Sequence, residues 1–506
     1  MNFDLAGNIG FQDRAPRAMR PRVAKSVGRN AVYNLIGSAL PLALSLATVP
    51  VYLKLVGPDR YSVLAIAWLF LGYFGLFDLG LGRATAYRIA AQKDAPPEDR
   101  AITFWTATLI NPMIGVITGG ILWIVSHWYF TGVFKVDAAL RPEILASVPL
   151  LALSVPIATL TGTLTGTLQG REQFLKINMI SVTSTALFQL LPLSIAYFHG
   201  PYLPLLLGSA TFARLLAVAW LWWECHREVG RGFAPRISRE RFNDLIGYGG
   251  WVAISSLIGP LLVVSDRFVI GGVLGALAVT HYTVPFQLVQ RIQIVPSAIT
   301  SALMPRMSGS DAAARERLGD MAGRILEALL TPGLLVAILL FEPAMKLWVG
   351  SGLGGEMAPA GRVMIVAFWV FALSSVKITL LYSSGRPRAV TTAYAIEIPL
   401  YFAVLFAAMH GYGLMGCAFA LLFRCGMDLV VQGWLFEKRL PGLRTFTNFA
   451  LLMVGTSVAA LMLTTPRLGA VLAGVLVIAS AILAARSLPA EARTMALDIV
   501  RRRRAA

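Results

Sequence analysis

Several long apolar stretches of this sequence contain charged side chains, and Arg291 is the first candidate for chemistry among them. Gln287 lies four residues before it and Gln290 beside it. Residues four apart share one face of an α-helix, so Gln287 and Arg291 are predicted to point the same way. A guanidinium can bind two phosphate oxygens at once, and the amides suit sugar hydroxyls. The face could therefore bind a sugar diphosphate; the alternative is a structural arginine that donates to helix-end carbonyls.

Glu397 is the second candidate, at the centre of another apolar stretch. Tyr394 and Tyr401 lie three residues before it and four after it, on the same predicted helix face. Burial disfavours the charged form of a carboxyl group, which suits proton coupling or sugar binding. The alternative is a carboxyl group that hydrogen-bonds a neighbouring helix.

Four further charges lie inside apolar stretches, where ionisable groups are costly and are candidates for function. Arg424 and Asp428 are spaced i, i+4, so we interpret them first as a mutually neutralising pair. Lys377 lies near one end of its stretch and could extend its ammonium group to the membrane surface. Arg214 lies mid-stretch with Thr211 one turn away, and a cavity role and a structural role are both open.

Two more charged pairs lie near the ends of apolar stretches. Asp78 and Arg83 could form a gate or end a helix, whereas Asp266 and Arg267 are interpreted as anchors at the membrane interface. The candidate substrate-binding residues are therefore Arg291, Gln287, Gln290, Arg214 and Lys377. The candidate coupling or gating residues are Glu397, Asp78, Arg83, Arg424 and Asp428.

The composition identifies the medium around these residues. Of 506 residues, 57% are hydrophobic and only 14% are charged, and the mean hydropathy is +0.68. A soluble domain carries about 25% charged residues, so this chain has too few to cover a surface in water. Most of the protein is expected to lie in hydrocarbon.

A membrane-spanning helix needs about 20 mostly apolar residues. On this criterion the sequence predicts an all-α polytopic membrane protein with about 14 transmembrane helices. The predicted spans are 31–53, 61–81, 102–126, 144–168, 174–198, 202–223, 244–265, 276–303, 325–349, 360–383, 389–409, 413–435, 446–464 and 468–486.

The basic residues predict the orientation. The net charge is +18, and of 44 lysines and arginines 32 lie in one set of alternate gaps, 8 in the other and 4 inside spans. Lysine and arginine accumulate on the cytoplasmic side of membrane proteins. Both termini are therefore predicted to be cytoplasmic. The protein is predicted to lie in the inner membrane, with its first span as an uncleaved anchor. A nucleic-acid partner is not expected, whereas the basic C-terminal tail suits anionic membrane lipids.

Other classes of function receive little support. The three cysteines have no metal-ligand spacing, and no phosphate-binding loop ends in Lys-Ser or Lys-Thr. The gaps between spans leave no room for a soluble catalytic domain. We therefore expect no metal, no cofactor and no enzyme activity.

Two segments of the chain resemble each other. Aligning Leu55-Val-Gly57 with Val273-Leu-Gly275 superposes two predicted helices and the turn between them, and residues 168–180 resemble 382–395 at a similar offset. The sequence therefore predicts two parallel six-helix repeats that form two lobes, plus a C-terminal helix pair. The expected division is a basic tail 1–29, an N-terminal lobe 30–224, a basic linker 225–243, a C-terminal lobe 244–440, a helix pair 441–490 and a basic tail 491–506.

The chain also resembles a known family over most of residues 28–440. It is similar to the polysaccharide repeat-unit flippases (O-antigen and exopolysaccharide type) of the multidrug/oligosaccharidyl-lipid/polysaccharide exporter superfamily. The stretches that carry the resemblance are Asn34-Leu-Ile-Gly, Leu55-Val-Gly-Pro-Asp-Arg-Tyr, Phe77-Asp-Leu-Gly-Leu-Gly-Arg-Ala, Leu168-Gln-Gly-Arg and Ser265-Asp-Arg-Phe-Val-Ile-Gly.

The resemblance implies two lobes around a cationic cavity, alternating access, and a polyprenyl-diphosphate-linked oligosaccharide as substrate. Arginines of cavity helices meet the diphosphate in related lipid II flippases, and Arg291 is the counterpart by helix. Polysaccharide polymerase and chain-length proteins would be partners. One alternative is a cation-coupled antiporter of organic cations in the same superfamily, although intramembrane Arg and Lys outnumber lone carboxylates here. A second is a membrane polysaccharide polymerase or ligase.

Overall fold

The computed structural model describes residues 40, 43–74, 80–245, 265–437 and 442–487, and within these ranges it contains helices and no strand. The predicted all-α fold is confirmed. The first helix described is Ala43–Val56, and an unlabelled helix covers 265–273. The labelled elements are α2 (Pro58–Phe74), α3 (Leu81–Ala91), α4 (Pro97–Trp128), η2 (Tyr129–Val133), η3 (Ala138–Leu140), α5 (Arg141–Gly170), α6 (Phe174–His199), α7 (Leu203–Cys225), η4 (His226–Gly230), α9 (Ala276–Val289), η5 (Gln290–Gln293), α10 (Ile294–Ser308), α11 (Ala312–Val349), α12 (Ser351–Ser383), α13 (Pro387–Glu437), α14 (Leu443–Thr464) and α15 (Pro466–Ser487).

The helices have the length and surface of membrane spans. Nine helices in the described ranges are long and apolar enough to cross a bilayer. Helix α15 turns Val471, Val475 and Ile478 outward, each more than half exposed. A row of exposed aliphatic side chains at helical spacing suits a lipid surrounding rather than water. The chain is a multi-pass membrane protein.

We define the N lobe as Ala43–Val56 together with α2–α7. Helices α4 and α5 approach closely at Gly115, where an added Cβ would lie 2.6 Å from the Pro156 Cα. The Asn111 side chain donates to the Thr159 carbonyl at 2.8 Å and to the Thr163 hydroxyl. Small residues and hydrogen-bonded polar side chains are typical of helix contacts in membranes.

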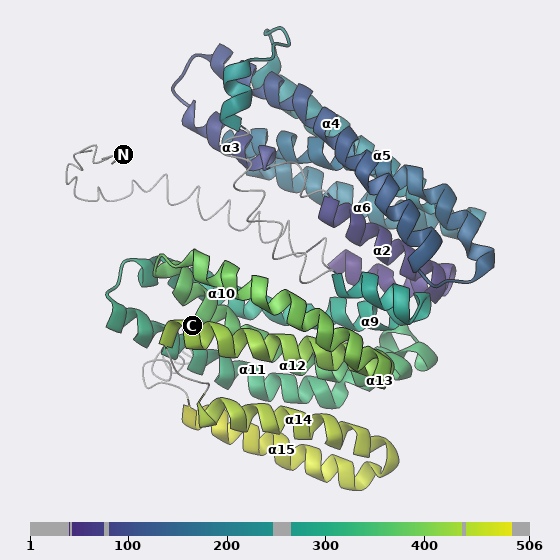
Figure 1. Ribbon diagram of the computed structural model, residues 1–506, viewed down its shortest axis with the longest axis vertical. Helices are drawn as coiled ribbons and strands as arrows, with labels where there is room; N and C mark the ends of the chain where they lie inside the picture. The colour runs from purple at the N-terminus through teal and green to yellow at the C-terminus, as the bar shows by residue number, and fades with distance from the viewer. Residues whose placement is uncertain (1–39, 41–42, 75–79, 246–264, 438–441, 488–506) are drawn as a thin grey trace, which may run out of the picture.

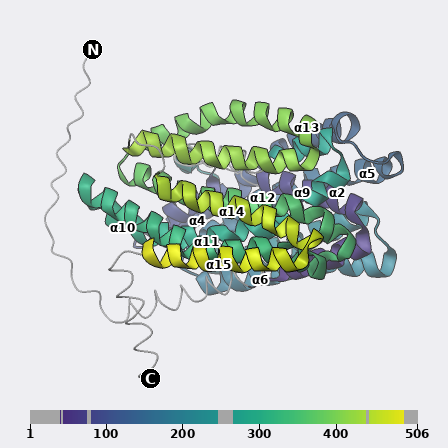
Figure 2. The same cartoon turned by 90° about the horizontal axis from the view of Figure 1, so that it is seen from below.

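We define the C lobe as 265–273 together with α9–α13. Helix α12 lies at its centre and packs against α9, α10, α11 and α13. Helix α13 is two helices joined at Gly413, whose φ of 55° lies in the left-handed region that glycine tolerates. Its two halves match the predicted spans 389–409 and 413–435. Helices α14 and α15 pack together on α11, and Figure 2 shows these helices running alongside one another.

The same turn follows the first described helix of each lobe. Gly57 and Gly275 both follow an apolar helix, both have positive φ (85° and 91°), and α2 and α9 start directly after them. These are the two glycines that the repeat alignment superposes. The structure therefore agrees with two copies of one unit, and the shared turn explains why glycine stands at both positions.

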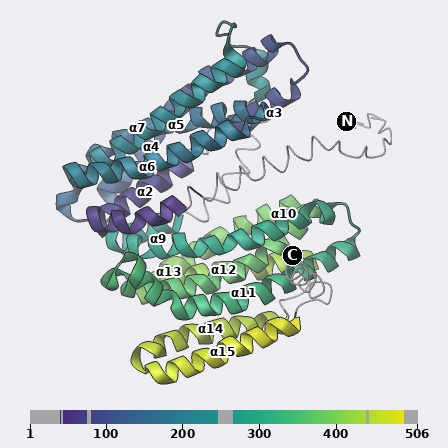
Figure 3. The same cartoon turned by 180° about the vertical axis from the view of Figure 1, so that it is seen from behind.

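In the part of the chain that the structure describes, the two lobes meet where α2 packs against α9. Figures 1 and 3 show them converging where α2 lies beside α9 and diverging towards α3 and the far end of α10. We call these the closed end and the open end. The long helices of both lobes run between the two ends.

Candidate functional site

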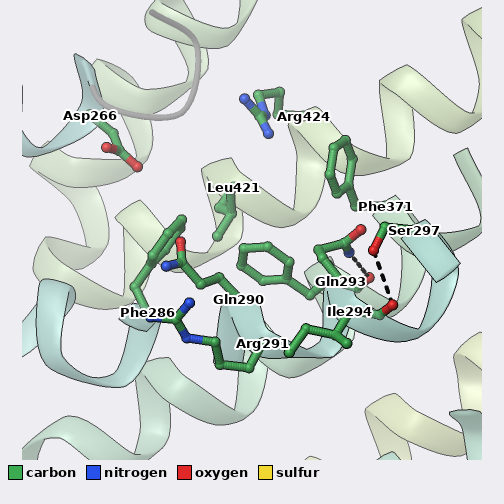
Figure 4. Close-up of a pocket in the computed structure, with 11 residues that line it drawn as sticks. Asp266, Phe286, Gln290, Arg291, Gln293, Ile294, Ser297, Phe371, Leu421 and Arg424 are labelled. Atoms are coloured by element: carbon green, nitrogen blue, oxygen red, sulfur yellow. Dashed lines mark hydrogen bonds between the residues drawn. The ribbon is translucent and has the colours of Figure 1, made fainter. Parts of the chain in front are cut away.

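A pocket of about 360 Å³ lies inside the C lobe. Four segments of the chain build it: the helix 265–273, the continuous run α9–η5–α10, and helices α12 and α13. Figure 4 shows Arg291 and Gln290 together at one wall, with Arg424 and Asp266 across from them. The lining residues are Asp266, Phe286, Gln290, Arg291, Gln293, Ile294, Ser297, Phe368, Phe371, Leu421 and Arg424.

Arg291 lies in a tightened turn that interrupts its helix. The sequence predicts one continuous helix over 276–303, but residues Gln290–Gln293 form a 3₁₀ turn between α9 and α10. Pro296, one turn further on, has no N–H for the Ile292 carbonyl and crowds it. Short 3₁₀ stretches inside helices often mark functional hinges. The 3₁₀ turn forms part of the pocket wall.

The break separates two residues that were expected to share a face. Gln290 and Arg291 line the pocket, whereas Gln287 donates to the Tyr61 hydroxyl of the N lobe at 3.5 Å. The 3₁₀ turn changes the angle between successive side chains. Gln287 therefore lies at the contact between the lobes, whereas Arg291 lines the pocket.

Arg291 has unused hydrogen-bonding capacity. Within the described part of the chain, its buried Nε atom has no hydrogen-bond partner. The turn that carries it is fixed by Gln293, whose side-chain amide donates to the Phe368 carbonyl at 3.1 Å. A guanidinium held in this way is available to an anionic oxygen of a ligand.

Asp266 and Arg267 are not interfacial anchors, because the structure buries both of them. They are 1% and 3% exposed and form an ion pair of 3.1 Å. The Tyr282 hydroxyl donates to the second Asp266 oxygen at 2.7 Å, and the Arg267 guanidinium stacks over the Phe286 ring at 3.9 Å. Asp266 is thus already neutralised beside the pocket.

Among the side chains that line the pocket, positive charges outnumber negative ones. Its lining contains two guanidinium groups, those of Arg291 and Arg424, and one carboxylate, which Arg267 engages. The remaining wall is largely aromatic, from Phe286, Phe368 and Phe371. In such a low-dielectric setting a fixed positive charge attracts an anion strongly. The arrangement can hold a small anionic group against an apolar wall.

A second group of ionisable residues lies deeper in the C lobe. The turn at Gly413 folds the halves of α13 together, so the Arg424 guanidinium lies over the Tyr401 ring at 5.7 Å. Glu397 and Asp428 are 2% and 4% exposed and interact electrostatically with each other and with Arg424. The predicted Arg424–Asp428 pair is thus part of a larger group that includes Glu397.

The other candidates lie away from the pocket lining. Arg214 is in the N lobe on α7, with its guanidinium over the Phe188 ring at 4.7 Å. Lys377 follows the lining residues of α12 without joining them, and Arg83 is exposed on α3. Asp78 lies outside the described residues. The roles given to these four residues stay predictions.

Several pocket residues were not among the candidates, notably Asp266, Phe286, Gln293, Phe368 and Phe371. The signal for Asp266 was present, since a carboxylate next to an arginine beside a long apolar stretch suits a buried pair. The phenylalanines carried no signal, because apolar side chains at helical spacing are ordinary in a membrane helix. Only the packing of α12 against α9 shows which of them face the site.

Comparison with known proteins gives consistent results. The profile of the family described as "Polysaccharide biosynthesis protein" matches residues 27–310. A Shigella flexneri protein described as "Putative O-antigen transporter" is 24% identical over 414 residues, which are 82% of this chain and 98% of that protein.

Solved structures match the fold. The lipid II flippase MurJ in an inward closed conformation superposes with a TM-score of 0.69 at 10% identity, covering 90% of this chain and 97% of that one. An inward-facing multidrug resistance MATE family transporter of the MOP superfamily gives 0.62 at 15% identity, covering 85% and 99%. At these identities the likenesses establish the fold alone.

Proposed function

We propose that this chain, which belongs to the polysaccharide biosynthesis protein family, moves polyprenyl-diphosphate-linked oligosaccharide repeat units from the cytoplasmic to the outer leaflet. The observation that carries the proposal is the pocket in the C lobe. It combines two guanidinium groups with an aromatic wall inside a membrane protein. Such costly buried charges have a use if they bind an anion that must cross the bilayer.

The geometry suggests how the substrate would be held. The diphosphate would bind between Arg291 and Arg424, with the Gln290 amide and the phenylalanine rings next to the first sugar, while the prenyl tail stays in lipid. The name of the Shigella relative supports a polysaccharide cargo. Movement would follow from alternate opening of the two lobes. The chain would act as a transporter and not as an enzyme.

The surroundings follow from the same proposal. The excess of basic residues in alternate gaps supports an inner-membrane protein with cytoplasmic termini, and the open end then faces the cytoplasm, where substrate is built. Lipid-linked oligosaccharide and membrane lipids would be its direct partners, with polymerase and chain-length proteins acting on the product. The division of the chain into tails, lobes, linker and helix pair given above remains part of the proposal.

Glu397 would couple transport to an ion. It is buried beside Arg424 and Asp428, and its Oε1 atom has no hydrogen-bond partner among the described residues. Protonation of Glu397 would change the charge that Arg424 experiences at the pocket. We expect Glu397→Gln to keep movement down a concentration gradient but to lose any acceleration by a pH gradient, measured in proteoliposomes with a fluorescent lipid-linked oligosaccharide.

The deciding experiment is reconstitution of the full chain in vesicles with a fluorescent polyprenyl-diphosphate oligosaccharide. Wild type should move the lipid between leaflets, and Arg291→Ala should slow it at least tenfold, because a charge-assisted hydrogen bond contributes about 1.5–3 kcal/mol. The matched control is Arg306→Ala, an exposed arginine at the end of α10 that does not line the pocket.

The outcomes separate the candidate functions. Movement that survives Arg291→Ala would keep the flippase and reject this pocket as its site. Absence of movement, together with proton- or sodium-driven efflux of organic cations, would favour the antiporter. Lengthening of the glycan in the vesicles would favour the polymerase.

A further inference from the structure

At the closed end, a short segment of the N lobe forms backbone hydrogen bonds with the C lobe. Helix α4 ends in a π-helical turn, Tyr129–Val133, and the chain then extends through Lys135. The Lys135 N–H donates to the Gly271 carbonyl at 3.1 Å, and its carbonyl accepts from the Ala276 N–H at 2.9 Å. These two bonds hold Lys135 against the turn that joins the helix 265–273 to α9.

Side chains reinforce the backbone bonds. The Lys135 ammonium group donates to the Val273 carbonyl, and the Tyr129 hydroxyl donates to the Phe268 carbonyl, both at 2.9 Å. We call the contact between 129–135 and 268–276 the clasp. Additional hydrogen bonds between the lobes lie beside it, including Thr280 to the Pro58 carbonyl at 2.6 Å.

The fit of the clasp depends on glycines. A Cβ on Gly271 would lie 2.6 Å from the Tyr129 hydroxyl and 2.7 Å from the Phe134 ring. A Cβ on Gly272 would lie 2.8 Å from a Val133 methyl group. Contacts this short do not occur between real side chains, so the two lobes close on each other only because Cβ atoms are missing there.

The clasp and the pocket share their supporting elements. The helix 265–273 carries Asp266 at the pocket and Gly271 at the clasp. Helix α9 carries Phe286 at the pocket and begins at Ala276, which bonds Lys135. A movement of either pocket wall therefore reaches the clasp through a rigid helix of only a few turns.

We propose that the clasp is the outer gate of the transporter, which seals the closed end and must part before substrate leaves the pocket on that side. Parting would break these hydrogen bonds, expose the glycine turn and separate α2 from α9 beside it. The inference rests on the proposed function for its transport readout only, because opening of the gate can be measured without substrate.

The first test measures opening directly. Ser297, which lines the pocket, becomes the single cysteine of a chain whose Cys225, Cys417 and Cys425 are replaced by alanine. A membrane-impermeant maleimide is then applied from the outer side. Gly271→Ala should raise the labelling rate at least threefold, because its methyl group wedges the clasp open. Gly120→Ala, on α4 with nothing within 4 Å of its added Cβ, should leave the rate unchanged.

A second, milder variant tests the gate in case Gly271→Ala fails to fold. Tyr129→Phe removes only the hydroxyl that bonds the Phe268 carbonyl and should raise labelling less than Gly271→Ala. Labelling that stays at the Gly120→Ala rate in both variants would overturn the proposal. This readout decides the gate even if the protein moves no lipid-linked oligosaccharide.

The second test locks the clasp. In the cysteine-free chain, Val133→Cys with Gly272→Cys places two sulfurs within disulfide reach, since the added Cβ lies 2.8 Å from a Val133 methyl carbon. Oxidation should reduce transport at least tenfold, and reduction should restore it. The control pair Gly319→Cys with Leu380→Cys, inside the C lobe, should transport equally in both states. The proposal would be overturned if the Val133→Cys/Gly272→Cys variant transported as fast with its disulfide formed as with its two thiols free.

Discussion

The two lobes share a plan but differ in what they bury. The N lobe joins its helices with hydroxyl and amide groups, as at Asn111 and Thr159 between α4 and α5. The C lobe buries ionisable groups, among them Asp266, Arg267 and Glu397. Neutral polar groups are enough to join helices in a membrane, whereas buried charges are costly there. The C lobe therefore carries charges that the fold itself does not require.

Equivalent positions show the difference most directly. The alignment of Gly57 with Gly275 places Thr48 opposite Asp266. Thr48 donates to the Gln189 amide oxygen at 3.3 Å, a neutral contact within its own lobe, whereas Asp266 forms a buried ion pair at the pocket. One copy of the repeat has a neutral structural contact at this position, and the other has a charged group at a candidate binding site.

The largest expected effect comes from breaking the buried ion pair. Arg267→Leu leaves Asp266 buried without its cation, which typically costs about 3–5 kcal/mol. Thr48→Val at the equivalent position should cost about 1 kcal/mol or less. Thermal unfolding of both variants in detergent would measure the contrast. The double variant Asp266→Asn with Arg267→Leu should recover part of the loss, and equal losses in the two lobes would contradict the comparison.

The next effect concerns arginines in mid-membrane. Arg291→Ala should weaken binding of a diphosphate lipid about tenfold to 100-fold, given about 1.5–3 kcal/mol for a charge-assisted hydrogen bond. Arg214→Ala should change it less than about threefold, because its guanidinium stacks on Phe188 within the N lobe and does not line the pocket. The readout is the KM for transport. A larger effect at Arg214 would move the anion site towards the N lobe.

Much of the fold could be predicted because the length of each apolar stretch can be counted in the sequence. Predicted spans such as 174–198 and 468–486 coincide with α6 and α15 to within a few residues. The repeat was also legible, because Gly57 and Gly275 occupy turns that need a positive φ. The polysaccharide family, suggested by short motifs, is confirmed by the family match to residues 27–310.

The site could be predicted only in part, because it depends on how helices face one another. Arg291 and Gln290 stood out as polar groups in an apolar stretch, and both line the pocket. Gln287 was predicted to join them, but its amide donates to the Tyr61 hydroxyl of the N lobe, a contact that the sequence does not show. Asp266 was interpreted as interfacial because it lies at the end of a predicted span. Its position in the sequence does not show that other helices pack over it.

The smallest effect tests whether hydrogen-bonded amide side chains have different roles in the two lobes. Gln293→Leu removes one hydrogen bond to the Phe368 carbonyl, about 0.5–1.5 kcal/mol, and frees the turn that carries Arg291. We expect the KM for the diphosphate lipid to rise about threefold while the melting temperature falls only slightly. Asn111→Ala, which removes an amide of the N lobe, should do the reverse and lower the melting temperature without changing the KM. If both variants changed the same quantity, amides in the two lobes would serve one purpose, and the division between a structural lobe and a binding lobe would fail.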